Sequence, residues 1–200
     1  MKKLLDNART FHDRVAPQRD MFRRFAAGQS PSTLFITCSD SRVVPALILR
    51  TGPGEVFELR NAGNIVPPYD PDRFSGEAAT LQYAVDVLQV KDVVVCGHSH
   101  CGAIGAVASG QDLAALPSVD RWVSFARPGL SPLLGAPPQD PAMAAFVQRH
   151  VAAQLDTLRG YPEVASAAAA GRLRLHGWYY RVDTAEVLEL DEGDGEFHLH

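Results

Sequence analysis

The sequence predicts an α/β fold: a mainly parallel central sheet of four strands plus a C-terminal antiparallel edge strand, helices on both faces, and an N-terminal helical arm. Short β-rich segments alternate with helical segments of ten or more residues, which is the pattern of βαβ units. The segment Val93 to Gly97 is wholly apolar, as a parallel strand covered on both faces requires. The 200 residues, 46% of them apolar and 21% charged, suffice for a single domain with a buried core.

The first half of the chain is expected to supply the arm and three strands. Residues 1–27 form the arm, with short helices on either side of Pro17, and residues 28–200 form the α/β core. The strands are predicted at Thr33 to Cys38, Glu55 to Arg60 and Val93 to Gly97, with a helical turn or two over Val43 to Leu49. Ser75 is expected to cap a helix that runs to about Gln89.

The second half is expected to complete the sheet and its cover. A helix follows Cys101, and Asp112 to Asp140 is Pro-rich and irregular. Further helices are predicted from Pro141 to Gly160 and from Pro162 to Gly171. Strands at Leu173 to Tyr180 and Glu186 to Leu190, joined by a short turn, form an antiparallel hairpin.

Charge and composition narrow the function classes. The net charge of −4 argues against a nucleic acid partner, which would favour a basic patch. The longest uncharged stretch, Val93 to Gln111, holds four Gly and two His and is not a membrane span, and no apolar signal segment follows Met1. We therefore expect a cytoplasmic protein with no membrane association. In that reducing compartment the cysteines favour metal binding or catalysis over disulfides.

Metal-type ligands stand at two strand ends. Ligands of open parallel sheets bind beyond the carboxyl ends of the strands, where Cys38 and the pair His98 and Cys101 are placed. Two thiolates and one imidazole are the ligand count of a catalytic zinc site whose fourth position is open. Cys96, inside its strand, is expected to be an inert core residue, and His100 should point elsewhere if Cys101 binds metal.

Asp40 and Arg42 follow Cys38 at the same strand end. The carboxylate could become a metal ligand, or it could be held back by the Arg42 fork and accept a hydrogen bond from bound water. Two non-catalytic or unrelated interpretations stay open. The site could be a structural zinc site closed by Asp40, in a binding module without activity. Alternatively, Ser99 could be the nucleophile of a serine hydrolase, although Cys101 replaces the last glycine of that motif.

The segments Cys38-Ser39-Asp40-Ser41-Arg42 and His98-Ser99-His100-Cys101-Gly102 together resemble the Cys-x-Asp-x-Arg and His-x-x-Cys motifs of the β-class carbonic anhydrases. The resemblance runs from about Ala8 to Leu190. Similar segments occur in that family at Gly28-Gln29-Ser30-Pro31, Gly54-Glu55-Val56-Phe57, Arg60-Asn61-Ala62-Gly63-Asn64, Gln82-Tyr83-Ala84-Val85 and His176-Gly177-Trp178-Tyr179-Tyr180.

The resemblance implies one Zn²⁺ per chain, held by Cys38, His98 and Cys101. It implies that Arg42 keeps Asp40 off the metal and that Asp40 accepts the proton of the zinc-bound solvent. The implied reaction is reversible hydration of CO2 to bicarbonate and a proton by zinc-bound hydroxide. Hydrolysis of carbonyl sulfide or carbon disulfide on the same scaffold is the alternative.

The resemblance also implies a substrate pocket and self-association. Gln29, Phe57 and Tyr83 would line the CO2 pocket, some of them contributed by a neighbouring subunit, although Phe57 and Tyr83 could equally be core residues. The N–H of Gly102, at a helix start, could meet a bicarbonate oxygen. The family's unit is a dimer with exchanged helical arms, often paired into a tetramer.

Some family members switch off when the Asp ligates zinc, a state that bicarbonate favours. That subgroup typically has Trp where this chain has Phe35 and Gly where it has Thr37. Arg60 and Val43 would suit such a bicarbonate switch, but the two departures argue against it, so we expect the constitutively open form here.

Overall fold

The computed structural model describes residues 1–128, 130, 133 and 141–199, which form two compact units, Met1–Ser30 and Pro31–His200. The first unit holds α1 (Lys2–Arg9), α2 (Phe11–Arg14), the 3₁₀ turn η1 (Ala16–Gln18) and α3 (Arg19–Phe25). Pro17 lies within η1, between the helical segments expected on either side of it. None of the residues in these elements is buried, and the rings of Phe11, Phe22 and Phe25 stack edge to face along the unit.

The second unit is built on one mixed sheet. Its strands are β1 (Thr33–Cys38), β2 (Val56–Asn61), β3 (Asp92–His98), β4 (Arg174–Tyr180), β5 (Val187–Leu190) and β6 (Phe197–Leu199), in the spatial order β2-β1-β3-β4-β5-β6. The pairs among β1 to β4 are parallel, and β5 and β6 pair antiparallel. The predicted four parallel strands and antiparallel hairpin are confirmed. The short strand β6 is an addition, and it takes the edge position that was expected for Val187–Leu190.

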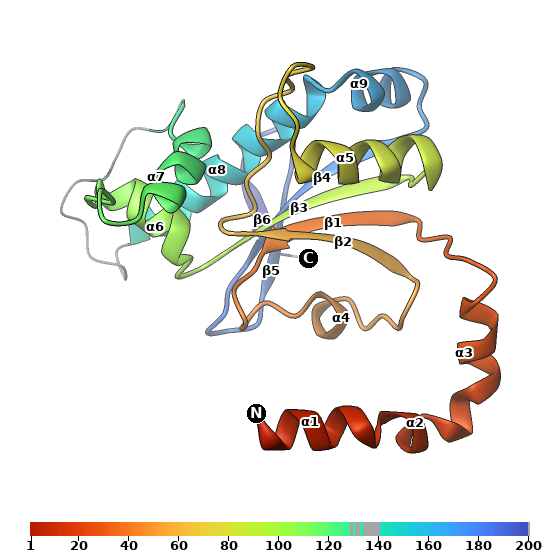
Figure 1. The fold of residues 1–200 in the computed structure, drawn as a ribbon. Coiled ribbons are helices and arrows are strands. Elements are labelled where there is room, and N and C mark those ends of the chain that lie inside the picture. The colour runs from red at the N-terminus through yellow and green to blue at the C-terminus, as the bar shows by residue number, and fades with distance from the viewer. Residues whose placement is uncertain (129, 131–132, 134–140, 200) are drawn as a thin grey trace. The chain divides into compact units, whose positions relative to one another are not determined.

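Helices lie against both faces of this sheet, as predicted, with the longer ones on one face and a helix of four residues on the other (Figure 1). Alternation along β1 sends Leu34 and Ile36 to one face, where they pack with buried residues of α8 (Pro141–Arg159), α9 (Pro162–Ala169) and the helix after Ser75. Phe35 points to the other face, where Leu49 at the end of α4 (Pro45–Ile48) packs against it. Remaining helical elements are α6 (Gly102–Ser109), α7 (Pro117–Val123) and the turn η3 (Ser124–Ala126).

Close packing of α8 on β3 sets the position of the strand end. A Cβ added at Gly97 would lie 2.6 Å from Cγ2 of Val151 and 2.9 Å from Cγ1 of Val147, so no larger residue fits here. The residue after Gly97 is His98, the last residue of β3 and a predicted metal ligand. The helix α8 therefore packs directly beside the strand end that carries this ligand.

Two helix predictions need correction. Ser75 caps its helix as expected, because its Oγ accepts a hydrogen bond from the N–H of Ala78 at 3.0 Å, but the α-helix α5 ends at Gln82. The π-helical turn η2 (Tyr83–Val87) continues it, and such turns are frequent at functional sites. Pro117 also starts α7 within a stretch expected to be irregular, because Pro is well suited to the first turn of a helix. Residues 129, 131–132 and 134–140 of that stretch lie outside the described residues.

The helices in the described part of the chain include none with the length and apolar character needed to cross a bilayer.

Candidate metal centre

The sheet register brings the predicted ligands to one edge. β1 and β3 are parallel neighbours in which Thr37 pairs with Cys96, so Cys38 and His98 stand at adjacent carboxyl ends. Cys101 lies three residues beyond His98 and immediately precedes α6. The prediction that two separate segments meet at this edge is confirmed by the strand pairing.

Three buried side chains form a cluster suited to one cation. One ligand atom from each of Cys38, His98 and Cys101 lies within 4.8 Å of the other two. The two sulfur atoms are 3.9 Å apart. No other group of this kind in the described chain is buried, since the second one, Asp191, Asp194 and His198, is exposed. Soft sulfur and imidazole donors at this spacing fit Zn²⁺.

The histidine is already oriented for a metal. Nδ1 of His98 donates a hydrogen bond to the carbonyl oxygen of Ser99 at 2.8 Å, which leaves the lone pair on Nε2. That Nε2 is buried and has no hydrogen-bond partner among the residues that the structure describes. A buried acceptor without a partner is costly unless it meets a cation, so the donor set fits a bound zinc ion.

The sulfur atoms also favour a cation between them. The hydrogen bond from the Cys101 thiol lowers the pKa of Cys38, and the backbone N–H of Gly63 acts in the same direction. The same contact with Cys38, together with burial, raises the pKa of Cys101. One proton is therefore shared by two sulfurs, and a divalent ion that replaces it allows both to be thiolates.

Asp40 is held by Arg42 beside this cluster. Nε of Arg42 donates to Oδ1 at 3.0 Å, Nη2 donates to Oδ2 at 2.7 Å, and the backbone N–H adds a third bond to Oδ1 at 2.9 Å. This fork holds the pKa of Asp40 well below its usual range. Oδ2 lies 3.9 Å from Nε2 of His98, so the ionised carboxylate faces the metal position while Arg42 retains it.

The contacts and burial of Ser99, His100 and Cys96 do not favour a part for them in the site. Oγ of Ser99 accepts a hydrogen bond from the N–H of Val182 at 2.9 Å and supports the chain after β4, which does not favour a nucleophile. His100 is exposed, and its carbonyl oxygen accepts from Nη2 of Arg42 at 3.0 Å. Burial raises the pKa of Cys96 to about 12, in keeping with an inert thiol.

Two of the predicted pocket residues, Phe57 and Tyr83, do not lie beside the cluster of their own chain. Gly102 does, as the first residue of α6, and a Cβ there would meet open space. Phe57 pairs with Leu34, whereas Cys38 pairs with Asn61, so four residues at about 3.3 Å each put Phe57 roughly 13 Å from the level of the cluster. The ring of Tyr83 lies 6.0 Å from that of Phe57 and shares its location. Gln29 belongs to the first unit.

Sequence reasoning missed the residues that hold the loops beneath the ligands. Arg60, at the end of β2, donates to the carbonyl oxygens of Cys38, Asp40 and Val43 at 2.8 to 3.0 Å through Nη2. The next loop, residues 61–66, is held by Trp122 and by His150 and Gln154 of α8. A histidine and a glutamine four residues apart on an otherwise apolar helix face were the available signal.

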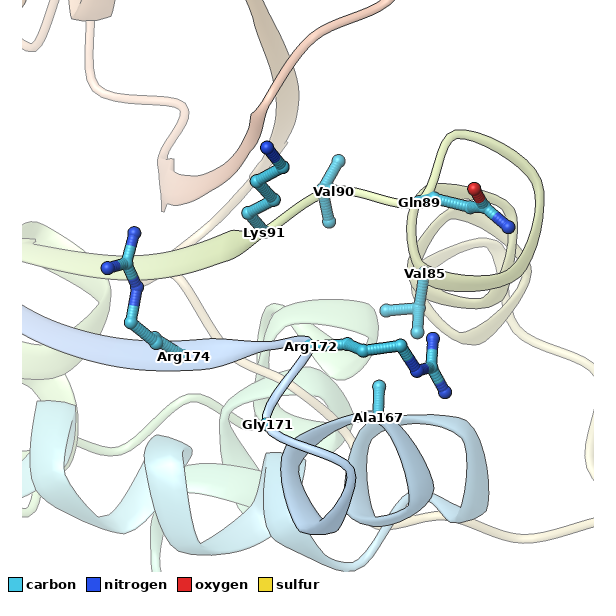
Figure 2. A pocket seen from close by; sticks show the side chains of 8 residues that line it. All are labelled: Val85, Gln89, Val90, Lys91, Ala167, Gly171, Arg172 and Arg174. Atoms are coloured by element: carbon cyan, nitrogen blue, oxygen red, sulfur yellow. The ribbon is translucent and has the colours of Figure 1, made fainter.

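One cavity lies near the carboxyl ends of the parallel strands and another lies near their amino ends. A cavity of about 590 Å³ opens beside the cluster, where Cys101, Gly102, Phe146 and Tyr179 are among its lining residues. Figure 2 shows a second cavity, of about 430 Å³, at the amino ends of β3 and β4. Its basic side chains, such as Lys91 and Arg174, belong to the opposite edge from the metal cluster, so this cavity is not part of the site.

Comparison with known proteins identifies the architecture. The carbonic anhydrase family model matches residues 33–187. The chain belongs to the β-carbonic anhydrase family. A carbonic anhydrase of Pseudomonas aeruginosa is 43% identical across 98% of this chain and 90% of its own length, and carbonic anhydrase 1 of Escherichia coli O157:H7 is 41% identical across 98% and 91%.

Solved structures of β-carbonic anhydrases share the fold. The β-carbonic anhydrase CcaA superposes with a TM-score of 0.92 at 36% identity and covers 100% of this chain and 99% of its own. One of two tetrameric β-carbonic anhydrases from Sordaria macrospora superposes with a TM-score of 0.80 at 30% identity, covering 94% and 95%. Enzymes of this family are zinc lyases, and the Cys-His-Cys cluster described above can bind one zinc ion.

Proposed function

We propose that this protein catalyses the reversible hydration of CO2 to bicarbonate and a proton. The observation that carries the proposal is the buried cluster of Cys38, His98 and Cys101, whose unpartnered Nε2 faces a carboxylate held 3.9 Å away. These three side chains would hold the zinc ion. Bound zinc would lower the pKa of a coordinated water to near neutrality and so supply a nucleophile.

Asp40 would orient that solvent molecule. The fork from Arg42 keeps the carboxylate ionised, and an ionised carboxylate can only accept hydrogen bonds. Oδ2 would therefore accept a hydrogen bond from the solvent O–H. This bond would orient the solvent molecule so that a lone pair of its own oxygen points towards CO2. Because Arg42 also binds the carbonyl oxygen of His100, the carboxylate is tied to the segment that carries two of the metal ligands. The pair of Asp40 and Arg42, called the dyad below, would thus keep the fourth metal position open. In a structural zinc site this position is closed by a fourth protein ligand.

Product would be held at the start of α6. The N–H of Gly102 lies at a helix N-terminus, which favours an anion such as bicarbonate, and the position is open. Phe57 and Tyr83 lie at the other end of the strands in their own chain, so they would line the CO2 pocket of a neighbouring copy, together with Gln29. Self-association into dimers or tetramers is part of this proposal, and the tetrameric relative from Sordaria macrospora supports it.

A cytoplasmic location is also proposed. Cys38, Cys96 and Cys101 are all free thiols in the structure, and the proposed site needs two of them reduced.

The test is CO2 hydration by stopped-flow, with zinc-loaded wild type beside Asp40→Asn. Turnover by wild type that is lost with Asp40→Asn at unchanged zinc content is the expected result. Carbonyl sulfide and carbon disulfide would be assayed in parallel, and faster turnover of either than of CO2 would reassign the substrate. A zinc-loaded wild type without hydration activity would show a structural zinc module instead.

A further inference from the structure

We infer that Trp122 and His150 are positioning residues that hold the backbone around Gly63 so that its N–H donates to the zinc ligand Cys38. The donor lies 3.3 Å from Sγ of Cys38. This inference rests on the proposed zinc site but not on the reaction. It gives a role to the segment Asn61-Ala62-Gly63-Asn64, to which the proposed function assigns none.

Gly63 occupies a position that only glycine fits. Its φ of +84° lies in the left-handed region, and an added Cβ would lie 3.0 Å from Cδ1 of Ile104 and 3.2 Å from the Cβ of Ala103. The loop closes on itself through Asn61, whose side chain donates to the carbonyl oxygen of Ile65 at 2.8 Å and accepts from its N–H at 2.9 Å. The loop therefore packs closely against α6. The residue immediately before this helix is Cys101, another of the proposed metal ligands.

Trp122 acts on the same peptide group that contacts the sulfur. Its Nε1 donates to the carbonyl oxygen of Ala62 at 2.8 Å. That carbonyl and the N–H of Gly63 belong to one planar trans peptide, so fixing the oxygen fixes the direction of the N–H. A hydrogen bond accepted by the carbonyl also polarises the group and strengthens the N–H as a donor to Cys38.

His150 holds the following peptide group. Its Nε2 donates to the carbonyl oxygen of Gly63 at 2.9 Å, and its Nδ1 accepts from Nε2 of Gln154 at 3.4 Å. Oε1 of Gln154 in turn accepts from the N–H of Val66 at 2.7 Å. Burial lowers the pKa of His150 to about 4, so at neutral pH the ring carries one proton, on the nitrogen that the loop requires.

The consequence reaches the metal through the sulfur. A backbone N–H directed at a thiolate withdraws charge from it and fixes its lone pairs, and such outer contacts commonly change metal affinity by about 10- to 100-fold. Trp122 and His150 approach from α7 and α8 and act on consecutive peptide groups. Loss of either should therefore weaken zinc binding without removing any ligand.

The experiment compares Trp122→Phe, His150→Leu and His150→Gln with wild type and with Trp178→Phe as the matched control. Trp178→Phe removes an indole N–H for which the described part of the chain supplies no partner, from a ring that packs on Phe35. Zinc affinity would be measured by chelator competition, and the sulfur-to-metal charge-transfer band would be recorded on the cobalt-substituted proteins. Thermal unfolding of the zinc-free proteins would be measured in parallel.

We expect zinc affinity to fall by about 10-fold for Trp122→Phe and by about 10- to 100-fold for His150→Leu, with a shifted cobalt band. His150→Gln, which keeps an N–H donor near the Nε2 position, should recover most of the affinity, and Trp178→Phe should match wild type. Unchanged affinity and an unchanged band in both loss variants, with only lower melting temperatures, would show a purely structural role. If His150→Leu does not fold, Trp122→Phe decides the question. Wild type that binds no zinc would instead refute the proposed function.

Discussion

Arg42→Gln should close the open metal position, and the structure gives the size of the effect. The substitution removes the Nε and Nη2 bonds to Asp40, at 3.0 and 2.7 Å, and leaves the backbone bond. A hydrogen bond to a charged group contributes about 1.5–3 kcal/mol when it is shielded from water. The Arg42 side chain is 47% exposed, so we take about 1 kcal/mol for each bond. The sum, about 2 kcal/mol, changes the equilibrium between held and released Asp40 by roughly 30-fold.

The released carboxylate has a short distance to travel, because Oδ2 is already 3.9 Å from Nε2 of His98. We expect Asp40 to occupy the solvent position on the metal and kcat to fall by about 10- to 100-fold. Loss of the fork also raises the pKa of Asp40 towards its ordinary value of about 4, which still leaves it ionised at neutral pH. A lower kcat at neutral pH would therefore report a change of position and not protonation.

The assay is stopped-flow CO2 hydration together with the visible spectrum of the cobalt-substituted protein, which responds when a carboxylate replaces solvent. The matched control is Arg174→Gln. Arg174 makes the same fork to Asp92, at 2.7 and 2.9 Å, from an exposed position at the other edge of the sheet. Full turnover and an unaltered spectrum in Arg42→Gln would refute the role given to the dyad.

Three further predictions follow from the same structure. Cys38→Ser should lower the zinc content from about one per chain to near zero, measured by elemental analysis, and CO2 hydration should be lost with it; retained zinc with full activity would contradict the ligand set. His150 has a pKa lowered by burial to about 4, so the unfolded chain binds its proton more readily and stability is lost as the pH falls from about 6.5 towards 4. We would measure the free energy of unfolding of the zinc-free protein in urea at pH 7 and at pH 5. The decrease between these two pH values should be about 2 kcal/mol smaller in His150→Gln than in wild type. Equal decreases in the two proteins would exclude a buried neutral histidine. Phe57→Ala should lower CO2 turnover although Phe57 lies far from the cluster of its own chain, and mixing it with inactive Asp40→Asn chains should restore activity in hybrids; no recovery would argue against a pocket shared between copies.

The fold was predictable where one local pattern determined it. Apolar runs such as Val93 to Gly97 and the cap at Ser75 are read from neighbouring residues, and the structure has both. The prediction failed where tertiary packing decided the outcome. The helix after Ser75 turns π-helical at Tyr83, and residues Phe57 and Tyr83 pack on each other at that turn. Helix propensity carries no information on such a change, because it describes the isolated segment.

The metal cluster was predictable from the sequence, whereas the contacts that hold the neighbouring loop in place were not. Cysteine and histidine are residue types that bind metal ions, which marks Cys38, His98 and Cys101 as candidate ligands. The carboxyl ends of parallel strands lie at the same end of a sheet, so the topology brings these candidates together. The support comes from bonds between side chains and backbone groups that are 60 and 87 residues apart, from Trp122 to Ala62 and from His150 to Gly63. A backbone carbonyl has the same chemistry at every position, so no residue type marks the one that receives such a bond. The sequence can therefore reveal which atoms are able to bind a metal ion, while the contacts that support them become visible only in the folded chain.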